Sequence, residues 1–94
     1  MKTITAKELK NTTTTEFVLV DVRENDERAA AHIDGIHIPL AEIPSRAAEI
    51  PQDTPVVVYC RGGVRSARAI EYLESIGYTN LTNLQGGIVA YLAD

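Results

Sequence analysis

Runs of apolar residues along the chain predict short buried strands. These runs are rich in valine, leucine and isoleucine and show little polar alternation, which is typical of strands buried on both faces of a parallel sheet. The run at 55–59 is the strongest, and the run at 36–39 ends at a proline that cannot donate to a ladder. We expect strands at 17–22, 36–39, 55–59 and 81–84.

The segments between these runs have the signatures of helices. Thr5 and Glu8 form the pattern of a capping box, which opens a short helix. The segment 67–76 has apolar residues at helical spacing through Ile76, and Gly77 follows as a C-terminal stop. Further short helices are expected at 25–30, at 44–50 and after Gly86-Gly87 through Tyr91.

Helices that alternate with apolar strands at these spacings predict crossover units in a parallel sheet. We therefore expect an α/β fold: a three-layer sandwich with a mostly parallel central sheet of about five strands, flanked by helices. A single domain over residues 1–94 is expected from the length. Ligands bind beyond the carboxyl ends of the strands in open parallel sheets. Cys60 directly follows the predicted strand 55–59, so it lies at such an end.

Composition and charge exclude several classes of function. The chain has 13 acidic and 9 basic residues and a net charge of −4, which makes nucleic acid or an anionic membrane a poor partner. Its apolar runs are too short to span a bilayer, and its first residues lack the apolar stretch of a signal peptide. One cysteine and two histidines, each isolated, predict no disulfide, no metal and no cofactor. The expected compartment is the reducing cytoplasm.

The segment from Cys60 to Ser66 carries the strongest chemical signal. It joins a predicted strand to a predicted helix and contains Gly62 and Gly63, which can adopt positive φ and turn backbone N–H groups inward as an anion-binding nest. The helix that follows points its positive end at the same place. A cysteine at the rim of such a nest is expected to have a lowered pKa and to act as a thiolate nucleophile.

Two arginines of the same segment suit an anionic substrate. Arg61 and Arg65 present guanidinium groups that match the geometry of oxyanions, and with Arg68 they predict a locally positive mouth on an acidic domain. A lone cysteine is by composition more often a small buried hydrophobe, but an inert cysteine needs none of these neighbours. The substrate-binding residues predicted around Cys60 are Arg61, Gly62, Gly63, Val64, Arg65 and Ser66.

Four segments, in order, resemble the signatures of single-domain rhodaneses, a family of sulfurtransferases. The segment 59–66 is close to the active-site loop of that family, and 20–24 is similar to its strand ending in Asp-Val-Arg. The stretch that begins at His32 and the pair Gly86-Gly87 resemble the other two signatures. Asp34 stands where the family usually has a proline.

The resemblance implies a double-displacement reaction without a cofactor. Cys60 would attack the sulfane sulfur of thiosulfate or a similar small anionic donor and become a persulfide. The loop amides would hold the outer sulfur, and Arg61 and Arg65 would steady the departing sulfite. A thiophilic acceptor would then remove the sulfur: a thiol or a protein in the cell, or cyanide in an assay.

Two other functions stay open beside sulfur transfer. A cysteine phosphatase or arsenate reductase would use a similar loop, but that loop has one more residue between cysteine and arginine than separates Cys60 from Arg65. A smaller nest suits a sulfur atom better than a phosphate. The third function is a non-catalytic rhodanese-like module that carries sulfur or binds a partner, although such modules commonly lose the cysteine that is retained here.

Asp21, Arg23 and His32 are supporting candidates. Asp21 and Arg23 follow the carboxyl end of a predicted strand and could approach the nest, but we interpret Arg23 as a buried, ion-paired brace. His32 could serve as a general base, whereas the resemblance implies a loop-bracing role. The acidic residues of 24–27 are interpreted as a solvated helix start matched to the helix dipole.

Overall fold

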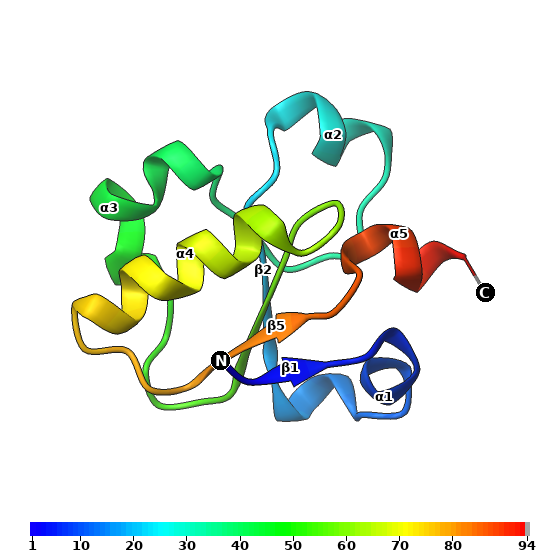
Figure 1. Cartoon of the computed structure of the whole chain (residues 1–94), viewed down its shortest axis with the longest axis horizontal. Helices are drawn as coiled ribbons and strands as arrows, with labels where there is room; N and C mark the ends of the chain where they lie inside the picture. Colours follow the sequence, from blue (N-terminus) through cyan, green and yellow to red (C-terminus); the bar gives the residue numbers. More distant parts are fainter. Residues whose placement is uncertain (94) are drawn as a thin grey trace.

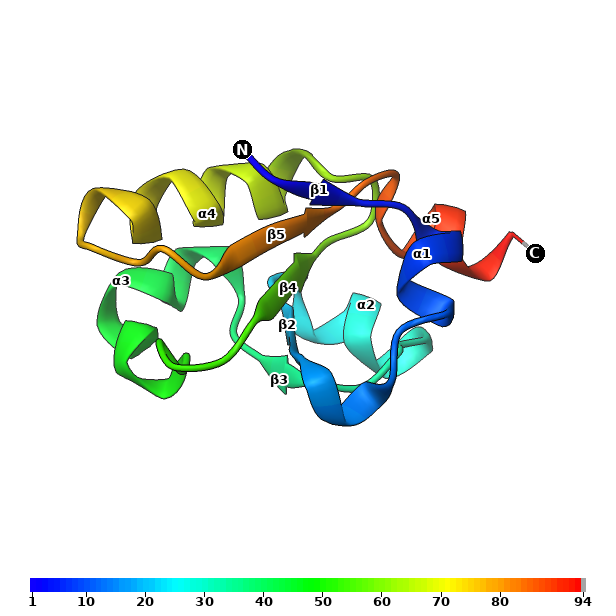
Figure 2. The same ribbon diagram turned by 90° about the horizontal axis from the view of Figure 1, so that it is seen from below.

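The computed structural model describes residues 1–93, and its strands form one parallel sheet. The strand order is β1-β5-β4-β2-β3, which places β4 at the centre between β5 and β2 (Figure 2; β1, β5 and β2 are also labelled in Figure 1). Neighbouring strands pair in parallel throughout. The expected α/β fold is therefore confirmed. The strands are β1 (Thr3–Ile4), β2 (Val18–Asp21), β3 (Ile36–His37), β4 (Val56–Tyr59) and β5 (Leu81–Leu84).

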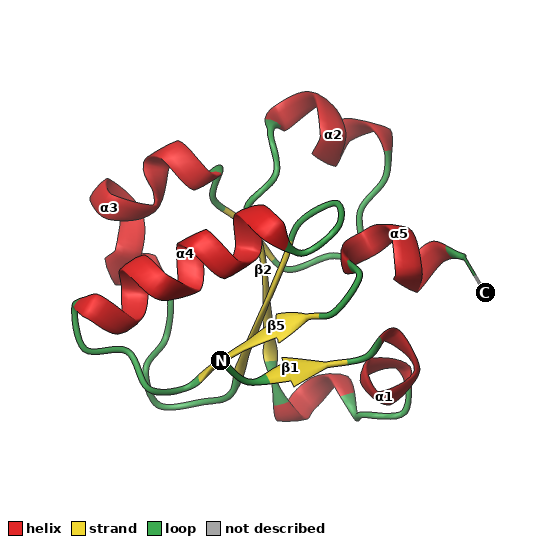
Figure 3. Cartoon of the chain, in the orientation of Figure 1, coloured by secondary structure: helices red, strands yellow, loops and turns green. Residues whose placement is uncertain are grey.

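Helices cover both faces of the sheet. α3 and α4 lie on one face, and α1 and α5 lie on the other (Figure 2). α2 follows the carboxyl end of β2, beside the loop that precedes α4 (Figure 3). The helices are α1 (Ala6–Lys10), α2 (Asn25–Ala30), α3 (Ile43–Arg46), α4 (Val64–Ser75) and α5 (Gly87–Leu92).

The central strand β4 is buried along its whole length, as its unbroken apolar pattern predicts. Val56 and Val58 belong to the core under α3 and α4, and Cys60 continues this core beyond the strand. Val57 and Tyr59 point to the opposite face and belong to the core under α1 and α5. Because side chains alternate between the faces of a strand, β4 supplies both cores and fixes the position of the loop that follows it.

The chain departs from the predicted elements mainly at the start of α4. The helix begins at Val64 rather than at 67, because Gly63 adopts a φ of 113° and turns the chain directly into the helix. The buried face of α4 accordingly runs from Ser66 to Leu73, and Ile76 is 50% exposed rather than part of the inner stripe.

Two short elements also differ from the prediction. β1 has only two residues, too few to form a recognisable apolar run, and it pairs with β5 at the edge of the sheet. The helix expected at 44–50 consists of α3 and a 3-10 turn at Ala47–Glu49. These differences leave the carboxyl end of the sheet as expected.

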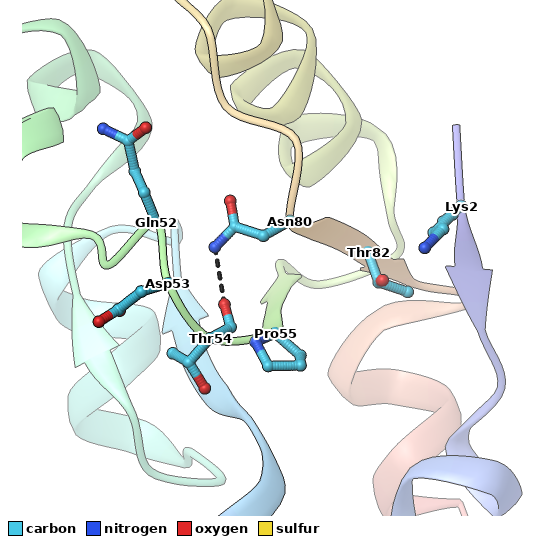
Figure 4. Close-up of a pocket in the computed structure, with 7 residues that line it drawn as sticks. All are labelled: Lys2, Gln52, Asp53, Thr54, Pro55, Asn80 and Thr82. Atoms are coloured by element: carbon cyan, nitrogen blue, oxygen red, sulfur yellow. Dashed lines mark hydrogen bonds between the residues drawn. The ribbon is translucent and has the colours of Figure 1, made fainter.

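A pocket of about 330 Å³ lies at the amino ends of β1, β4 and β5, far from Cys60 (Figure 4). The Asn80 side chain beside it donates hydrogen bonds to the carbonyls of Pro51 and Thr54, at 2.8 and 2.7 Å. These bonds hold the turn that leads into β4, so we assign Asn80 a structural role. The pocket is lined by Lys2, Gln52, Asp53, Thr54, Pro55, Asn80 and Thr82.

Candidate active site around Cys60

Cys60 lies at the carboxyl end of the central strand, where three strand ends meet. It follows Tyr59, the last residue of β4, which is in register with Asp21 at the end of β2. The end of β5 leads into Gly86-Gly87 on the other side. Only 1% of Cys60 is exposed in this structure without ligand. The sheet therefore brings together the segments that the sequence singled out.

The sulfur of Cys60 is surrounded by hydrogen-bond donors from the turn into α4. The Gly63 backbone N–H donates to Cys60 Sγ at 3.0 Å, and Ser66 Oγ lies 3.3 Å from the sulfur. The amino end of α4, a helix of 12 residues, begins at the same turn. Backbone donors and the positive end of a helix dipole both favour a negative charge at this position.

The pKa of the Cys60 thiol lies below its ordinary value. Burial of the sulfur raises this pKa, but the contact with the Ser66 hydroxyl and hydrogen bonds from the N–H groups of Ser66, Gly63 and Gly62 outweigh the effect of burial. A lower thiol pKa increases the fraction of thiolate, which is the nucleophilic form. The loop thus favours the thiolate form of Cys60.

The orientation of the loop depends on α5. The N–H of Ile88 donates to the Cys60 carbonyl at 2.9 Å, and the N–H of Val89 donates to the Arg61 carbonyl at 3.2 Å. Gly87, at a φ of 60°, packs so closely on these carbonyls that a Cβ would overlap both. Because α5 binds the loop carbonyls from outside, the loop N–H groups are left to face the sulfur.

Of the two loop glycines, only Gly63 needs its conformational freedom. Its φ is 113°, a value that L-residues with a side chain rarely adopt. Gly62 does not have a positive φ, and a Cβ there would meet nothing within 4 Å. The expectation that both glycines require positive φ is therefore wrong for Gly62, which contributes its N–H group instead. Val64 is 68% exposed as the first residue of α4.

Asn83 supports the loop, and the sequence analysis did not identify it. The Ser66 hydroxyl donates to Asn83 Oδ1 at 2.5 Å, and Asn83 Nδ2 donates to the Gly63 carbonyl at 3.0 Å. Since a carbonyl only accepts, the second bond fixes the orientation of the amide. The sequence did contain a sign of this role: Asn83 is a polar residue in the buried strand Leu81–Leu84, where an amide without a hydrogen-bond partner would be costly.

The arginines of the loop and of the first turns of α4 have different surroundings. Both terminal nitrogens of Arg65 donate to the carboxylate of Glu27 in α2, at 2.6 and 2.9 Å. The side chains of Arg61 and Arg68 make no hydrogen bond or ion pair with other residues of 1–93. Glu27 is therefore not the freely solvated helix start that the sequence suggested. It is the partner of Arg65, and the pair joins α2 to the first turn of α4.

Asp21 and Arg23 form a buried ion pair beside the loop. Arg23 donates to both carboxylate oxygens of Asp21, through Nε at 3.0 Å and a terminal nitrogen at 2.9 Å, and to the Ala31 carbonyl at 2.8 Å. Arg23 is 4% exposed and Asp21 is fully buried. The pair thus ties the end of β2 to the far end of α2, in line with the interpretation of Arg23 as a brace.

His32 contacts its own turn rather than the sulfur. Its Nδ1 accepts the Asp34 backbone N–H at 3.0 Å, and 42% of its side chain is exposed. Asp34 has a φ of 73°, which a proline ring could not adopt. Tyr59 Oη donates to the Asp34 carbonyl at 3.1 Å and anchors the turn to β4. These contacts fit a loop-bracing role for His32.

We expect Ser66→Ala to raise the pKa of Cys60. The Ser66 hydroxyl donates its one proton to Asn83 Oδ1 in this structure, but it can turn that proton to the sulfur once the thiol has ionised, and the variant lacks it. The rate of alkylation by iodoacetamide, measured against pH, should show its midpoint at higher pH than in the wild type. Ser75→Ala is the matched control, since the Ser75 hydroxyl donates to the Tyr72 carbonyl at the far end of α4. An unchanged midpoint in Ser66→Ala would mean that the backbone N–H groups alone lower the pKa.

Two further properties concern residues 1–93 as a whole. No helix in this part of the chain combines the length and hydropathy needed to cross a membrane. Within the same residues, histidine, cysteine, aspartate and glutamate side chains do not gather in any group of three that could hold a metal ion.

Comparison with known sequences gives consistent matches. The family model for the rhodanese-like domain matches residues 5–94. A sulfurtransferase from Allochromatium vinosum is 46% identical over 79 residues, which cover 83% of this chain and 74% of the relative. The probable adenylyltransferase/sulfurtransferase MoeZ from Mycobacterium tuberculosis is 42% identical over 94 residues, which cover 95% of this chain but only 24% of MoeZ. The chain thus spans about a quarter of that larger relative.

Solved structures agree with the sequence matches. The crystal structure of a rhodanese-like domain protein from Staphylococcus aureus superposes with a TM-score of 0.88 at 36% identity, covering 97% of this chain and 91% of that one. The match therefore covers nearly the whole chain. This chain belongs to the rhodanese-like domain family.

Proposed function

We propose that this protein is a sulfurtransferase that carries a sulfane sulfur as a persulfide on Cys60. The observation that carries the proposal is the position of Cys60 Sγ, at 3.0 Å from the Gly63 N–H and at the amino end of α4, with a pKa below that of an ordinary thiol. The names of the Allochromatium and mycobacterial relatives support sulfur transfer as the reaction class.

In the first half-reaction, the Cys60 thiolate attacks the outer sulfur of a donor such as thiosulfate. A new S–S bond forms at Cys60 as the S–S bond of the donor breaks, and sulfite leaves with the electron pair of that bond. The product is a persulfide anion whose outer sulfur would accept hydrogen bonds from the N–H groups of Gly62, Gly63 and Ser66. Arg61, with no partner within residues 1–93, is available to bind the leaving sulfite.

In the second half-reaction, an acceptor removes the outer sulfur. A thiolate or cyanide attacks it, the persulfide S–S bond breaks, and the Cys60 thiolate is regenerated. Proton and electron balance is complete without a redox partner, because the sulfane sulfur is passed on in the same oxidation state. The acceptor would be a small thiol or a cysteine of another protein.

Phosphate transfer is the weaker alternative. In the loops of cysteine phosphatases the arginine binds the substrate oxyanion, whereas here Glu27 occupies both terminal nitrogens of Arg65. The loop also lacks one residue between Cys60 and the arginine. A purely non-catalytic module would not require the lowered pKa of Cys60. The Glu27–Arg65 pair, the shorter loop and the lowered pKa of Cys60 all favour sulfur transfer.

Intact-protein mass spectrometry tests the proposal directly. We expect that incubation with thiosulfate or a thiosulfonate adds the mass of one sulfur atom, which dithiothreitol then removes. Cys60 is the only cysteine, so protein blocked with iodoacetamide is a matched control and should gain nothing. Absence of a sulfur adduct with every sulfane donor tried, at a pH where Cys60 is alkylated rapidly, would rule out the persulfide.

A further inference from the structure

The ion pair between Glu27 and Arg65 joins α2 to the first turn of α4, close to the loop of Cys60. The guanidinium and the carboxylate meet through two parallel hydrogen bonds, and the side chains are 26% exposed for Glu27 and 31% for Arg65. Glu27 Oε1 also accepts the backbone N–H of Glu24 at 3.0 Å, as part of the capping box of α2. The carboxylate is therefore fixed by two different elements, α2 and α4.

This arrangement changes the charge that an approaching donor meets. Hydrogen bonds from Arg65 and from the Glu24 backbone lower the pKa of Glu27 to about 2, so Glu27 is ionised at neutral pH. The charge of Arg65 interacts with that of the Cys60 thiolate, which places the ion pair within electrostatic range of the sulfur. An anion bound at Cys60 thus lies within range of a fixed negative charge, and Arg65 offers it little net attraction.

Two other arginines near Cys60 in the sequence, Arg61 and Arg68, compensate only in part. Arg61 and Arg68 are exposed side chains without partners in residues 1–93, so solvent screens them strongly. Glu27 and Arg65 are more buried, and their interaction with a bound anion is screened less. Glu27 therefore reduces the attraction that the site offers to a second negative charge on the donor.

We propose that Glu27 is a specificity-determining residue that selects singly charged sulfane donors, such as organic thiosulfonates and persulfides, over the doubly charged thiosulfate ion. The inference rests on the proposed persulfide chemistry of Cys60 and names its donor class. With a thiosulfonate, the Cys60 thiolate takes the terminal sulfur, the S–S bond of the donor breaks, and a sulfinate leaves with the electron pair. Charge and atoms balance as they do with thiosulfate and sulfite.

A pair of alkylating agents tests the charge selection without any sulfur transfer. Iodoacetamide is neutral and iodoacetate is an anion, but both alkylate the same thiolate. We expect Glu27→Gln to raise the ratio of the iodoacetate rate to the iodoacetamide rate about five- to tenfold. This is the effect on an anionic reagent of removing one nearby negative charge in a partly solvated site. Because both rates scale with the thiolate fraction, the ratio is independent of any change in the pKa of Cys60.

Matched variants separate charge from shape. Asp26→Asn removes an exposed charge from the same turn of α2 without touching Arg65, and it should leave the ratio near the wild-type value. Glu27→Asp keeps the charge and should also stay close to wild type. Glu27→Ala serves as a second neutral variant if circular dichroism shows that Glu27→Gln perturbs the fold. Equal ratios in the wild type and in both folded neutral variants would overturn the inference.

Steady-state kinetics with two donors complete the test. We expect the wild type to have a higher kcat/KM for methanethiosulfonate than for thiosulfate, and Glu27→Gln to reduce this preference about five- to tenfold. Turnover with both donors and an unchanged preference in Glu27→Gln would refute the role of Glu27. If neither donor is turned over while the alkylation ratio still responds to Glu27→Gln, the proposed function fails but the charge selection stands.

Discussion

Cys60→Ser is expected to abolish sulfur transfer from thiosulfate or a thiosulfonate to cyanide, by more than about a thousandfold in kcat/KM. A serine hydroxyl is not ionised at neutral pH, and it cannot form a persulfide. The remaining loop would still bind an anion but would have no nucleophile to offer it. Thiocyanate formation, followed as its ferric complex, measures the loss.

The same variant should keep its fold. Serine is close in size to cysteine. Its hydroxyl oxygen can still accept the Gly63 N–H, and its hydroxyl proton can be donated to Ser66 Oγ. Urea unfolding of Cys60→Ser should therefore give a midpoint near that of the wild type, so that the loss of activity reflects chemistry. Turnover above a trace in a folded Cys60→Ser protein would show that another group carries the sulfur.

Much of this site is predictable because it depends on local sequence. An unbroken apolar strand, a cysteine and a glycine-containing turn before a helix are all consecutive in the chain, from Val56 to Ser66. Parallel strands place their carboxyl ends at one edge, so Asp21 and Gly86 could also be placed near Cys60. The resemblance to rhodaneses added the reaction, which the residue pattern alone left among several thiolate chemistries.

The features that escaped prediction are contacts between distant segments. Glu27 is 38 positions from Arg65, and Asn83 is 17 positions from Ser66. Nothing within α2 distinguishes an acid that pairs across the site from one that faces solvent, because both stabilise the start of a helix. The start of α4 at Val64 depends on the positive φ of Gly63. The sequence alone does not show which of the adjacent glycines, Gly62 or Gly63, adopts this conformation.

Stability should depend most strongly on the buried pair beside the site. We expect Asp21→Asn to lower the free energy of unfolding by about 3–5 kcal/mol, because it leaves the buried Arg23 charge without its counter-ion. This is a large part of the roughly 5–15 kcal/mol that stabilises a typical domain. Arg23→Met should also destabilise the fold, but by less, since Arg28 still forms an ion pair with Asp21, at 3.4 Å.

The pH dependence of this pair has a definite sign. Burial raises the pKa of Asp21, but hydrogen bonds from the side chain and backbone of Arg23 outweigh burial, so the folded pKa lies below the ordinary value. The pair therefore stabilises the fold fully above the unfolded pKa of about 4, and this stability is lost as pH falls through the folded pKa. The difference in unfolding free energy between wild type and Asp21→Asn should be constant near neutrality and should shrink in acid.

Urea unfolding of matched variants decides the role of this pair. Glu49→Gln removes the exposed ion pair with Arg46, whose side chains are 48% and 34% exposed, and should cost no more than about 1 kcal/mol. Because both variants replace one carboxylate by an amide of the same size, their difference measures the effect of burial. If Asp21→Asn is as stable as Glu49→Gln, the pair does not stabilise the fold, and the interpretation of Arg23 as a structural brace is wrong.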